Sequence, residues 1–166
     1  MSEDLSKAVH AVVRDCLGVK ANEEVLIICN PATQVLGEAM RAEAASVGAE
    51  SVLAVMIERA SHAGEPPATL AAAMIAADVV LAPTVQSLSH TAARKLASES
   101  GTRIATLPGA TTEMLARVMS DDMPELRRRG GRVAEILDHG TEARITCDHG
   151  SDLRLGLQGR TAIPDA

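Results

Sequence analysis

The chain of 166 residues contains no phenylalanine, tyrosine or tryptophan. Its core must therefore be built from alanine, valine, leucine, isoleucine and the seven methionines, which forgo the large buried area of aromatic rings. An interior of small side chains is typical of helices packed closely against a sheet. The absence of aromatic rings also excludes an aromatic stacking platform for nucleic-acid bases.

Cysteine is scarce as well, and the three cysteines (Cys16, Cys29 and Cys147) are widely spaced without a Cys-x-x-Cys pair. This pattern indicates neither a disulfide framework nor a structural zinc site. A reduced, cytoplasmic setting is therefore the expected localisation.

Positive charge is outnumbered, because 16 lysines and arginines face 22 acidic residues and the formal net charge is −6. Nucleic acid and anionic membrane surfaces are therefore not expected as main partners, since both require a basic face. The start of the chain (residues 1–4) is acidic, unlike a signal peptide. No apolar run approaches the roughly 20 residues of a membrane span.

Several sequence motifs of well-known active sites are missing. Asn30-Pro31-Ala32-Thr33 stands after the first predicted strand, where a dinucleotide-binding fold would carry Gly-x-Gly-x-x-Gly. The chain has no Walker A, His-Glu-x-x-His or Gly-x-Ser-x-Gly motif. Its five histidines are dispersed, and no two lie at a metal-binding spacing on one helix.

Short apolar runs alternate with segments of helical periodicity along most of the chain. Such a pattern is typical of an α/β fold, a parallel sheet with helices on both faces. Strands that are buried on both sides should read as continuous apolar runs, and these do. The predicted strands are residues 24–29, 51–57, 78–82 and 103–107.

The carboxyl-terminal part follows a different pattern. Residues 142–147 and 152–157 alternate apolar and polar side chains around Asp148-His149-Gly150-Ser151, which predicts an antiparallel β-hairpin. An isolated hairpin is marginally stable, so its apolar face requires a partner. We therefore expect an α/β domain over residues 1–140 and, over 141–166, the beginning of a second domain that the chain does not contain.

The stretch from Asp78 to Gly101 contains the strongest candidate site. A buried strand runs into a polar loop and then a helix, for which Ser87 and Ser89 are candidate N-caps. Ligands of open parallel sheets bind beyond the carboxyl ends of the strands. This places His90, Thr91 and Arg94 where such folds bind their ligands.

His90 is the candidate catalytic residue of this stretch. At a helix start the macrodipole disfavours an imidazolium, and a neutral histidine there could accept or donate a proton near neutral pH. Arg94 lies four residues on and shares its helix face, where it could hold a carboxylate. The alternative is that His90 and Arg94 merely secure the loop and the helix.

Two further features allow both a functional and a structural interpretation. Glu65 precedes two prolines and is either a fixed carboxylate that contacts substrate or a stabiliser of the positive end of a helix dipole. Arg127–Arg132 is a basic cluster. In so acidic a chain, a solvated helix face or an interdomain contact is the expected role of this cluster, in preference to a nucleic-acid patch.

Five motifs stand in order along most of the chain. They are Glu65-Pro66-Pro67, Ser87-Leu88-Ser89-His90-Thr91 with Ala93-Arg94, Arg103-Ile104-Ala105-Thr106-Leu107-Pro108-Gly109, Gly150-Ser151-Asp152-Leu153 and Gly159-Arg160. In order and spacing they resemble one family, the aminopeptidase T or leucyl aminopeptidase family of thermophilic-type metallopeptidases.

The resemblance implies a two-domain enzyme with a Rossmann-like amino-terminal domain. Its carboxyl-terminal domain would supply Glu, His and Asp ligands for divalent metals such as Zn, Mn, Co or Fe. The same superfamily is similar to 2,5-dihydroxypyridine 5,6-dioxygenases, which hold one Fe(II) in the corresponding half. Within this chain the resemblance implies no metal ligand and no cofactor.

The resemblance therefore predicts the amino-terminal domain of a metallo-aminopeptidase that is inactive alone. His90 is its candidate catalytic residue, and Ser87, Thr91, Arg94 and Glu65 are its candidate substrate-binding residues. The substrate of the full-length enzyme would be a small peptide or a small aromatic molecule. A dioxygenase amino-terminal part and a non-catalytic, oligomerising or partner-binding module remain alternatives. The expected partner is a second copy of the chain or a carboxyl-terminal metal-binding half.

Overall fold

Two compact units make up the chain in the computed structural model, which describes residues 2–119 and 123–163. Unit 1 comprises residues 1–120 and unit 2 comprises residues 121–166. The long helix α6 (Met123–His139) groups with the hairpin in unit 2. The expectation that the hairpin begins a further domain stays a prediction.

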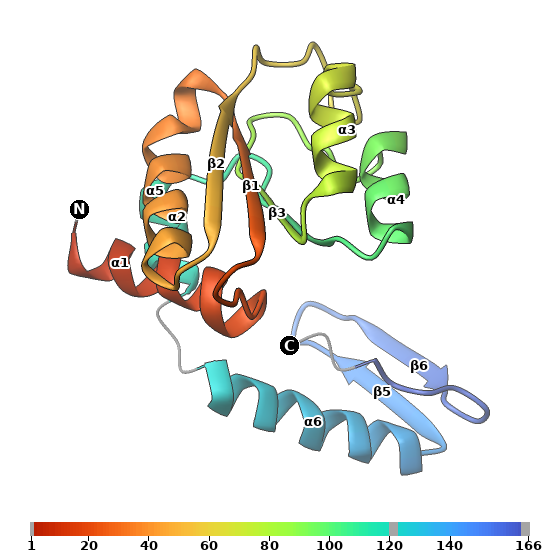
Figure 1. Ribbon diagram of the computed structural model, residues 1–166. Helices are drawn as coiled ribbons and strands as arrows, with labels where there is room; N and C mark the ends of the chain where they lie inside the picture. The colour runs from red at the N-terminus through yellow and green to blue at the C-terminus, as the bar shows by residue number, and fades with distance from the viewer. Residues whose placement is uncertain (1, 120–122, 164–166) are drawn as a thin grey trace. The chain divides into compact units, whose positions relative to one another are not determined.

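A four-stranded parallel sheet forms the centre of unit 1 (Figure 1). The strands lie in the order β2-β1-β3-β4. The chain passes from β1 out to β2 and then returns to β3 on the other side of β1, so the direction of winding reverses between β1 and β3. The strands are β1 (Glu24–Cys29), β2 (Glu50–Val55), β3 (Val79–Ala82) and β4 (Arg103–Thr106).

Helices cover both faces of this sheet, as the sequence predicts. Successive side chains of a strand point to opposite faces, so each strand contributes to a core on either side. Val25, Ile27 and Leu81 pack into a core with α1 (Glu3–His10), α2 (Gln34–Ser46) and α5 (Thr112–Val118). Leu26 and Val80 pack into a second core with α3 (Ala68–Ala76) and α4 (Ala92–Glu99). Figure 1 shows the two helical layers on either side of the strands.

Unit 1 contains five α-helices among its described residues, together with a π-helix and a 3-10 turn. Residues 3–16 form one continuous helical segment that changes from α to π geometry. No helix in the described ranges is long and apolar enough to cross a membrane. The elements are α1 (Glu3–His10), the π-helix Ala11–Cys16, the 3-10 turn Pro31–Thr33, α2 (Gln34–Ser46), α3 (Ala68–Ala76), α4 (Ala92–Glu99) and α5 (Thr112–Val118).

Unit 2 consists of α6 (Met123–His139) and an antiparallel hairpin of β5 (Glu142–Thr146) and β6 (Asp152–Gly156). The predicted antiparallel hairpin is confirmed, and Ile145 lies opposite Leu153 in it. Cross-strand neighbours point to the same face, so apolar side chains gather on one face of the hairpin. The guanidinium of Arg144 donates to both carboxylate oxygens of Asp152, from Nε at 2.8 Å and from a terminal nitrogen at 2.9 Å.

Candidate functional site

Four loops follow the carboxyl ends of the strands of unit 1 and form one edge of the sheet. Parallel strands end at the same edge, and in open α/β sheets this is where ligands bind, next to the point where winding reverses. We call these segments the carboxyl-edge loops. They are residues 30–33, 56–67, 83–91 and 107–111.

Asn30 joins three of these loops with one buried side chain. Its Nδ2 donates to the carbonyl of Met56 at 2.9 Å, and its Oδ1 accepts from the amide of Val85 at 2.8 Å. Its own amide donates to the hydroxyl of Thr33 at 3.0 Å. Because Asn30 is only 1% exposed, these hydrogen bonds replace water entirely and fix the loops relative to one another.

The loop 56–67 is also bound directly to the loop 83–91. The amide of Ser87 donates to Nδ1 of His62 at 3.0 Å, and the amide of Ala63 donates to the carbonyl of Ser87 at 2.8 Å. An amide can only donate, so Nδ1 of His62 accepts and the proton of the neutral ring lies on Nε2. The loop 107–111 joins through the amide of Gly109, which donates to the carbonyl of Thr84 at 2.9 Å.

The start of α4 is capped from two directions. Thr91 is the N-cap residue, and its hydroxyl accepts from the amide of Arg94 at 3.1 Å. The carboxylate of Glu65 accepts from the amides of Ala92 and Ala93 at 2.5 and 3.2 Å. Glu65 therefore stabilises α4 rather than the helix that directly follows it in sequence, and the negative charge suits the positive end of the dipole.

The predicted caps Ser87 and Ser89 do not cap the helix, which begins later. The hydroxyl of Ser87 accepts from the amide of Ser89 at 3.1 Å and donates to its hydroxyl at 2.9 Å. The hydroxyl of Ser89 also meets that of Thr106 at 2.7 Å. Both serines stabilise the turn before α4. A short hydroxyl side chain can hydrogen-bond nearby backbone groups and so compete with the hydrogen bonds of a helix.

The other candidate substrate-binding residues carry hydrogen bonds within the protein. Arg94 folds back on the loop, and its Nε donates to the carbonyl of Ser89 at 2.8 Å. Thr91 is buried, and its hydroxyl donates to the carbonyl of Leu88 at 2.8 Å. Substrate contact by Ser87, Thr91, Arg94 and Glu65 stays a prediction.

His90 differs from these neighbours. It is exposed and makes no hydrogen bond or ion pair within the part of the chain that the structure describes. It directly precedes the N-cap of α4 and lines a shallow depression of about 400 Å³ together with Ser89, Arg94 and Lys95. The backbone on both sides of His90 is fixed, while its imidazole is free to meet a ligand.

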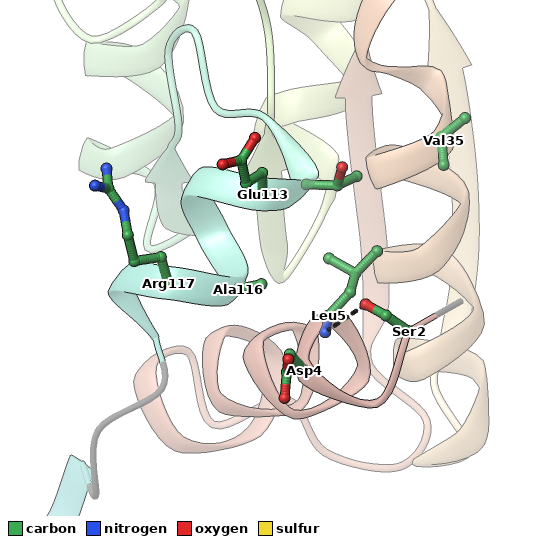
Figure 2. Close-up of a pocket in the computed structure, with 8 residues that line it drawn as sticks. Ser2, Asp4, Leu5, Val35, Glu113, Ala116 and Arg117 are labelled. Atoms are coloured by element: carbon green, nitrogen blue, oxygen red, sulfur yellow. Dashed lines mark hydrogen bonds between the residues drawn. The ribbon is translucent and has the colours of Figure 1, made fainter.

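A second depression lies where winding reverses between β1 and β3. Its volume is about 430 Å³, and Thr33, Val85 and Gly109–Thr112 are among the residues that line it. It shares Val35 and Thr112 with a third, larger hollow of about 740 Å³ between α1, α2 and α5. Figure 2 shows this third hollow, with Leu5 and Ala116 from facing helices.

No set of ligands for a divalent metal accompanies these depressions. Within residues 2–119 and 123–163, no group of three or more His, Cys, Asp and Glu side chains could hold a metal ion. Cys29 lies at the end of β1, but burial raises the pKa of its thiol. A raised pKa makes this thiol a poorer metal ligand, because the thiolate is the form that binds metal. The described residues thus supply no metal site of their own, and the resemblance places the metal in a carboxyl-terminal half.

Sequence reasoning missed Asn30 and His62 as organisers of the site. The sequence showed Asn30 only as part of the segment that ends the first strand, and it showed His62 only as one residue of a loop. The signal that could have found Asn30 is a short polar residue directly after a buried strand, where it can reach neighbouring loops at the sheet edge.

The sheet order and the linked loops beyond it define a Rossmann-like α/β domain of the kind that binds ligands at the carboxyl edge of its sheet. Residues 4–165 match the model of the family NicX, 2,5-dihydroxypyridine 5,6-dioxygenase. The chain belongs to this family. No curated protein sequence matches the chain significantly.

Two solved structures share the fold. The 2,5-dihydroxypyridine dioxygenase from Pseudomonas putida KT2440 is 17% identical, with a TM-score of 0.70 over 94% of this chain and 48% of that chain. Wild-type AmpT from Thermus thermophilus is 16% identical, with a TM-score of 0.59 over 92% of this chain and 53% of that chain. This chain spans about half the length of either structure.

The comparisons confirm the predicted relationship to both proteins and change the order of the two predicted functions. The sequence analysis placed the aminopeptidase first and the dioxygenase second. The family match favours the dioxygenase family, whereas the likeness to AmpT is one of fold.

Proposed function

We propose that the chain is the amino-terminal part of an enzyme of the 2,5-dihydroxypyridine dioxygenase type and forms one wall of its substrate cleft. The family match over residues 4–165 supports the reaction class. The coverage of about half of each related structure supports a partial role. The metal, Fe(II) in this proposal, would be held by a carboxyl-terminal half.

One observation carries the placement of the site. In the loop 83–91, the side chains of Thr84, Ser87, Ser89 and Thr91 are all hydrogen-bonded within the protein, whereas that of His90 is exposed and has no partner among the described residues. A rigid loop that presents one free imidazole is suited to proton transfer, because the ring is positioned before the substrate arrives.

His90 would orient the substrate or move a proton at one of its hydroxyl groups. A neutral imidazole offers one nitrogen that donates and one that accepts, so it can take a proton from a hydroxyl and return it. Thr91 and Glu65 would hold the helix start from which His90 projects. They would act on the reaction through the position of His90.

The carboxyl-terminal half would also cover unit 2. Val133 and Ile136 of α6 are 55% and 64% exposed, and Ile145 and Leu153 of the hairpin are 54% and 51% exposed. Exposed apolar groups of this size within one small unit are typical of a surface that is buried in a complex. A second copy of this chain is the alternative occupant.

The aminopeptidase alternative has weaker support, because it rests on a fold likeness with a TM-score of 0.59. The two functions make different demands on the depression beside His90. A dioxygenase half should accept a small dihydroxylated ring, whereas an aminopeptidase half should accept the amino terminus of a peptide.

The test is a titration of the ¹⁵N-labelled 166-residue chain, followed by NMR. One series uses 2,5-dihydroxypyridine under anaerobic conditions, and a parallel series uses leucyl-glycine. The proposal predicts that 2,5-dihydroxypyridine shifts the amide resonances of His90 and its neighbours in a saturable manner. It also predicts that His90→Ala weakens this binding by about tenfold.

The matched control is His149→Ala, since His149 is an exposed histidine in the hairpin turn of unit 2. This variant should bind 2,5-dihydroxypyridine as the unchanged chain does. Binding of leucyl-glycine alone would favour the aminopeptidase alternative. Binding that does not depend on His90 would contradict the proposed site.

A further inference from the structure

The strand β2 forms one edge of the sheet in unit 1. It has β1 on its inner side, and none of the strands that the structure describes lies on its outer side (Figure 1). The amides of Glu50 and Met56 donate inward, to carbonyls on the side of β1. Backbone groups point to the two sides of a strand in turn, so those of Ser51, Leu53 and Val55 point outward. The outer edge of β2 is therefore a row of donors and acceptors that another strand can bind.

This edge lacks the features that keep natural edge strands from pairing, which are shortness, lysine, proline and bulges. β2 has six residues and pairs with β1 residue by residue, without a bulge. Residues 51–57 contain neither a charged side chain nor a proline. At the opposite edge of the sheet, β4 has four residues and begins with Arg103. Of the two edges, β2 is the one that is open to a further strand.

One face of this edge is apolar and adjoins α3. Val52 is 57% exposed and lines a hollow of about 350 Å³ together with Ala73 and Ala76 of α3. Glu24 is the one charged residue that lines this hollow. Residues 66–77, which include all of α3, carry no charge. An exposed valine beside an uncharged surface helix is typical of an area that a partner covers.

The other face of the edge is covered by α2. The hydroxyl of Ser51 donates to the carbonyl of Arg41 at 3.2 Å. A Cβ added at Gly37 would lie 2.9 Å from Cδ1 of Leu53. The helix therefore runs antiparallel to β2, with position 41 beside position 51 and position 37 beside position 53. The middle of this helical stretch lies beside Val52.

The flank of α2 that lies toward the outer edge carries one charge of each sign. Glu43, on the opposite flank, contacts Nδ1 of His10 at 3.1 Å and Nε of Arg14 at 2.6 Å, so that flank faces the first helical segment. Glu38 and Arg41 are three residues apart and share the other flank. Both are exposed, and Arg41 has no partner among the residues that the structure describes.

We propose that unit 1 dimerises through this edge, with β2 paired antiparallel to β2 of a second copy about a two-fold axis between the two Val52 side chains. Each Ser51 then lies opposite Leu53 of the second copy, and both direct their N–H and C=O groups toward each other. Glu50 lies opposite Ala54, so no like charges meet across the strands. The two four-stranded sheets become one continuous sheet. An identical strand suffices as the partner, because a two-fold interface is self-complementary.

The charges on α2 favour a second copy and fix the register. Because the middle of the stretch 37–41 lies beside Val52, an axis there brings Glu38 of one copy within about 1.5 Å, along the helix, of Arg41 of the other. The two-fold axis makes this contact twice. An axis at Leu53 would separate the two charges by about 7.5 Å along the helix. Complementary charges of this kind select a partner and its register.

Sedimentation velocity of the 166-residue chain over a range of concentrations tests the proposal, which does not depend on the dioxygenase function. We expect a reversible equilibrium between monomer and dimer. Val52→Lys places two ammonium groups side by side at the axis and should raise the dissociation constant of the dimer by at least about tenfold. The matched control is Val118→Lys, because Val118 of α5 is 59% exposed and lies outside this edge. This control should dimerise as the unchanged chain does.

A charge exchange on α2 tests the register separately from the strand. Glu38→Arg and Arg41→Glu should each raise the dissociation constant by about three- to tenfold, since each places like charges opposite one another. The variant with both changes forms the pair again with its charges exchanged, and it should recover the dimer. Far-UV circular dichroism of each variant checks that the fold is kept.

Three results would overturn the proposal. The first is a chain that stays monomeric at every concentration. The second is a dimer that Val52→Lys leaves intact, above all one that Ile136→Lys in unit 2 disrupts instead. The third is a double charge variant that dimerises no better than either single variant.

Discussion

Unit 1 and unit 2 fold by different means. In unit 1, alternate side chains of β1 and β3 enter two separate cores, and Ile27, Ile28 and Leu81 are fully buried. In unit 2, Ala134 is the one buried residue between residues 123 and 163. The first unit carries its own hydrophobic stabilisation, whereas the second has secondary structure with almost no core.

Local interactions account for the secondary structure of unit 2. Arg144 pairs with Asp152 and Arg154 with Glu142 across the hairpin. Gly150 has a φ of +93° in the turn, a conformation that glycine adopts readily. Exposed ion pairs and a tight turn contribute little stability. This difference supports the proposal that unit 2 completes its core against another polypeptide.

The largest expected effect is on the free energy of unfolding when matched isoleucines are truncated. Ile27→Ala removes a fully buried side chain, and Ile136→Ala removes one that is 64% exposed. We expect Ile27→Ala to lower the free energy of unfolding by about 2–5 kcal/mol. Ile136→Ala should change it by less than about 0.5 kcal/mol. Urea denaturation measures both, and equal effects would contradict the contrast between the units.

Thiol labelling gives the second contrast. Burial raises the pKa of Cys29, whereas hydrogen bonds from the Ser151 side chain and from backbone groups of the hairpin turn lower the pKa of Cys147. Iodoacetamide at neutral pH should modify Cys147 faster than Cys29 by about 100-fold, because the thiolate is the nucleophile. Peptide mass spectrometry over time measures both rates. Comparable rates would mean that unit 1 opens readily or that Cys147 is covered.

The third prediction concerns the joint between the loops. Asn30→Ala leaves the carbonyl of Met56 and the amide of Val85 without their present partner. It should lower the free energy of unfolding of unit 1 by about 1–3 kcal/mol. Gln34→Ala, which removes a partly exposed side chain bonded to Glu38, is the control and should have little effect. An Asn30 variant as stable as the control would show that the loops do not depend on this side chain.

The smallest expected effect is a dependence of stability on pH. The hydrogen bond from Arg103 holds the pKa of Glu23 below its ordinary value. The folded state therefore disfavours protonation, and the stabilisation is present above the unfolded pKa and lost as pH falls through the folded one. Glu23→Gln should remove this part of the pH dependence, with a loss of at most about 1 kcal/mol at neutral pH. Identical acid profiles of the variant and the unchanged chain would contradict it.

The sheet could be predicted from the sequence because its strands are short apolar runs separated by helical periodicity. Leu26, Ile27 and Ile28 point to both faces in turn, so a continuous apolar run signals burial on two sides. The hairpin followed from the alternation of apolar and polar residues around Gly150. These features depend on residues that are close in sequence, and such signals can be read before the fold is known.

The site was less predictable, because its hydrogen bonds join residues that are distant in sequence. Glu65 caps a helix 27 residues further on, and Asn30 reaches Val85 across 55 residues. The start of α4 was misplaced for the same reason, since three hydroxyl residues precede it and the loop contacts decide that Thr91 caps it. The sequence identified His90 as a candidate. It could not show that the neighbouring side chains are hydrogen-bonded within the protein while the imidazole of His90 is not.

Amide hydrogen exchange on the 166-residue chain tests the central contrast most directly. The account predicts that amides of β1 and β3 exchange only through global unfolding, while those of α6, β5 and β6 exchange quickly, with little protection. Addition of a carboxyl-terminal half should then slow exchange in unit 2. Protection of β5 and β6 equal to that of β1 in the chain alone would contradict the account, because unit 2 would be stable without a partner.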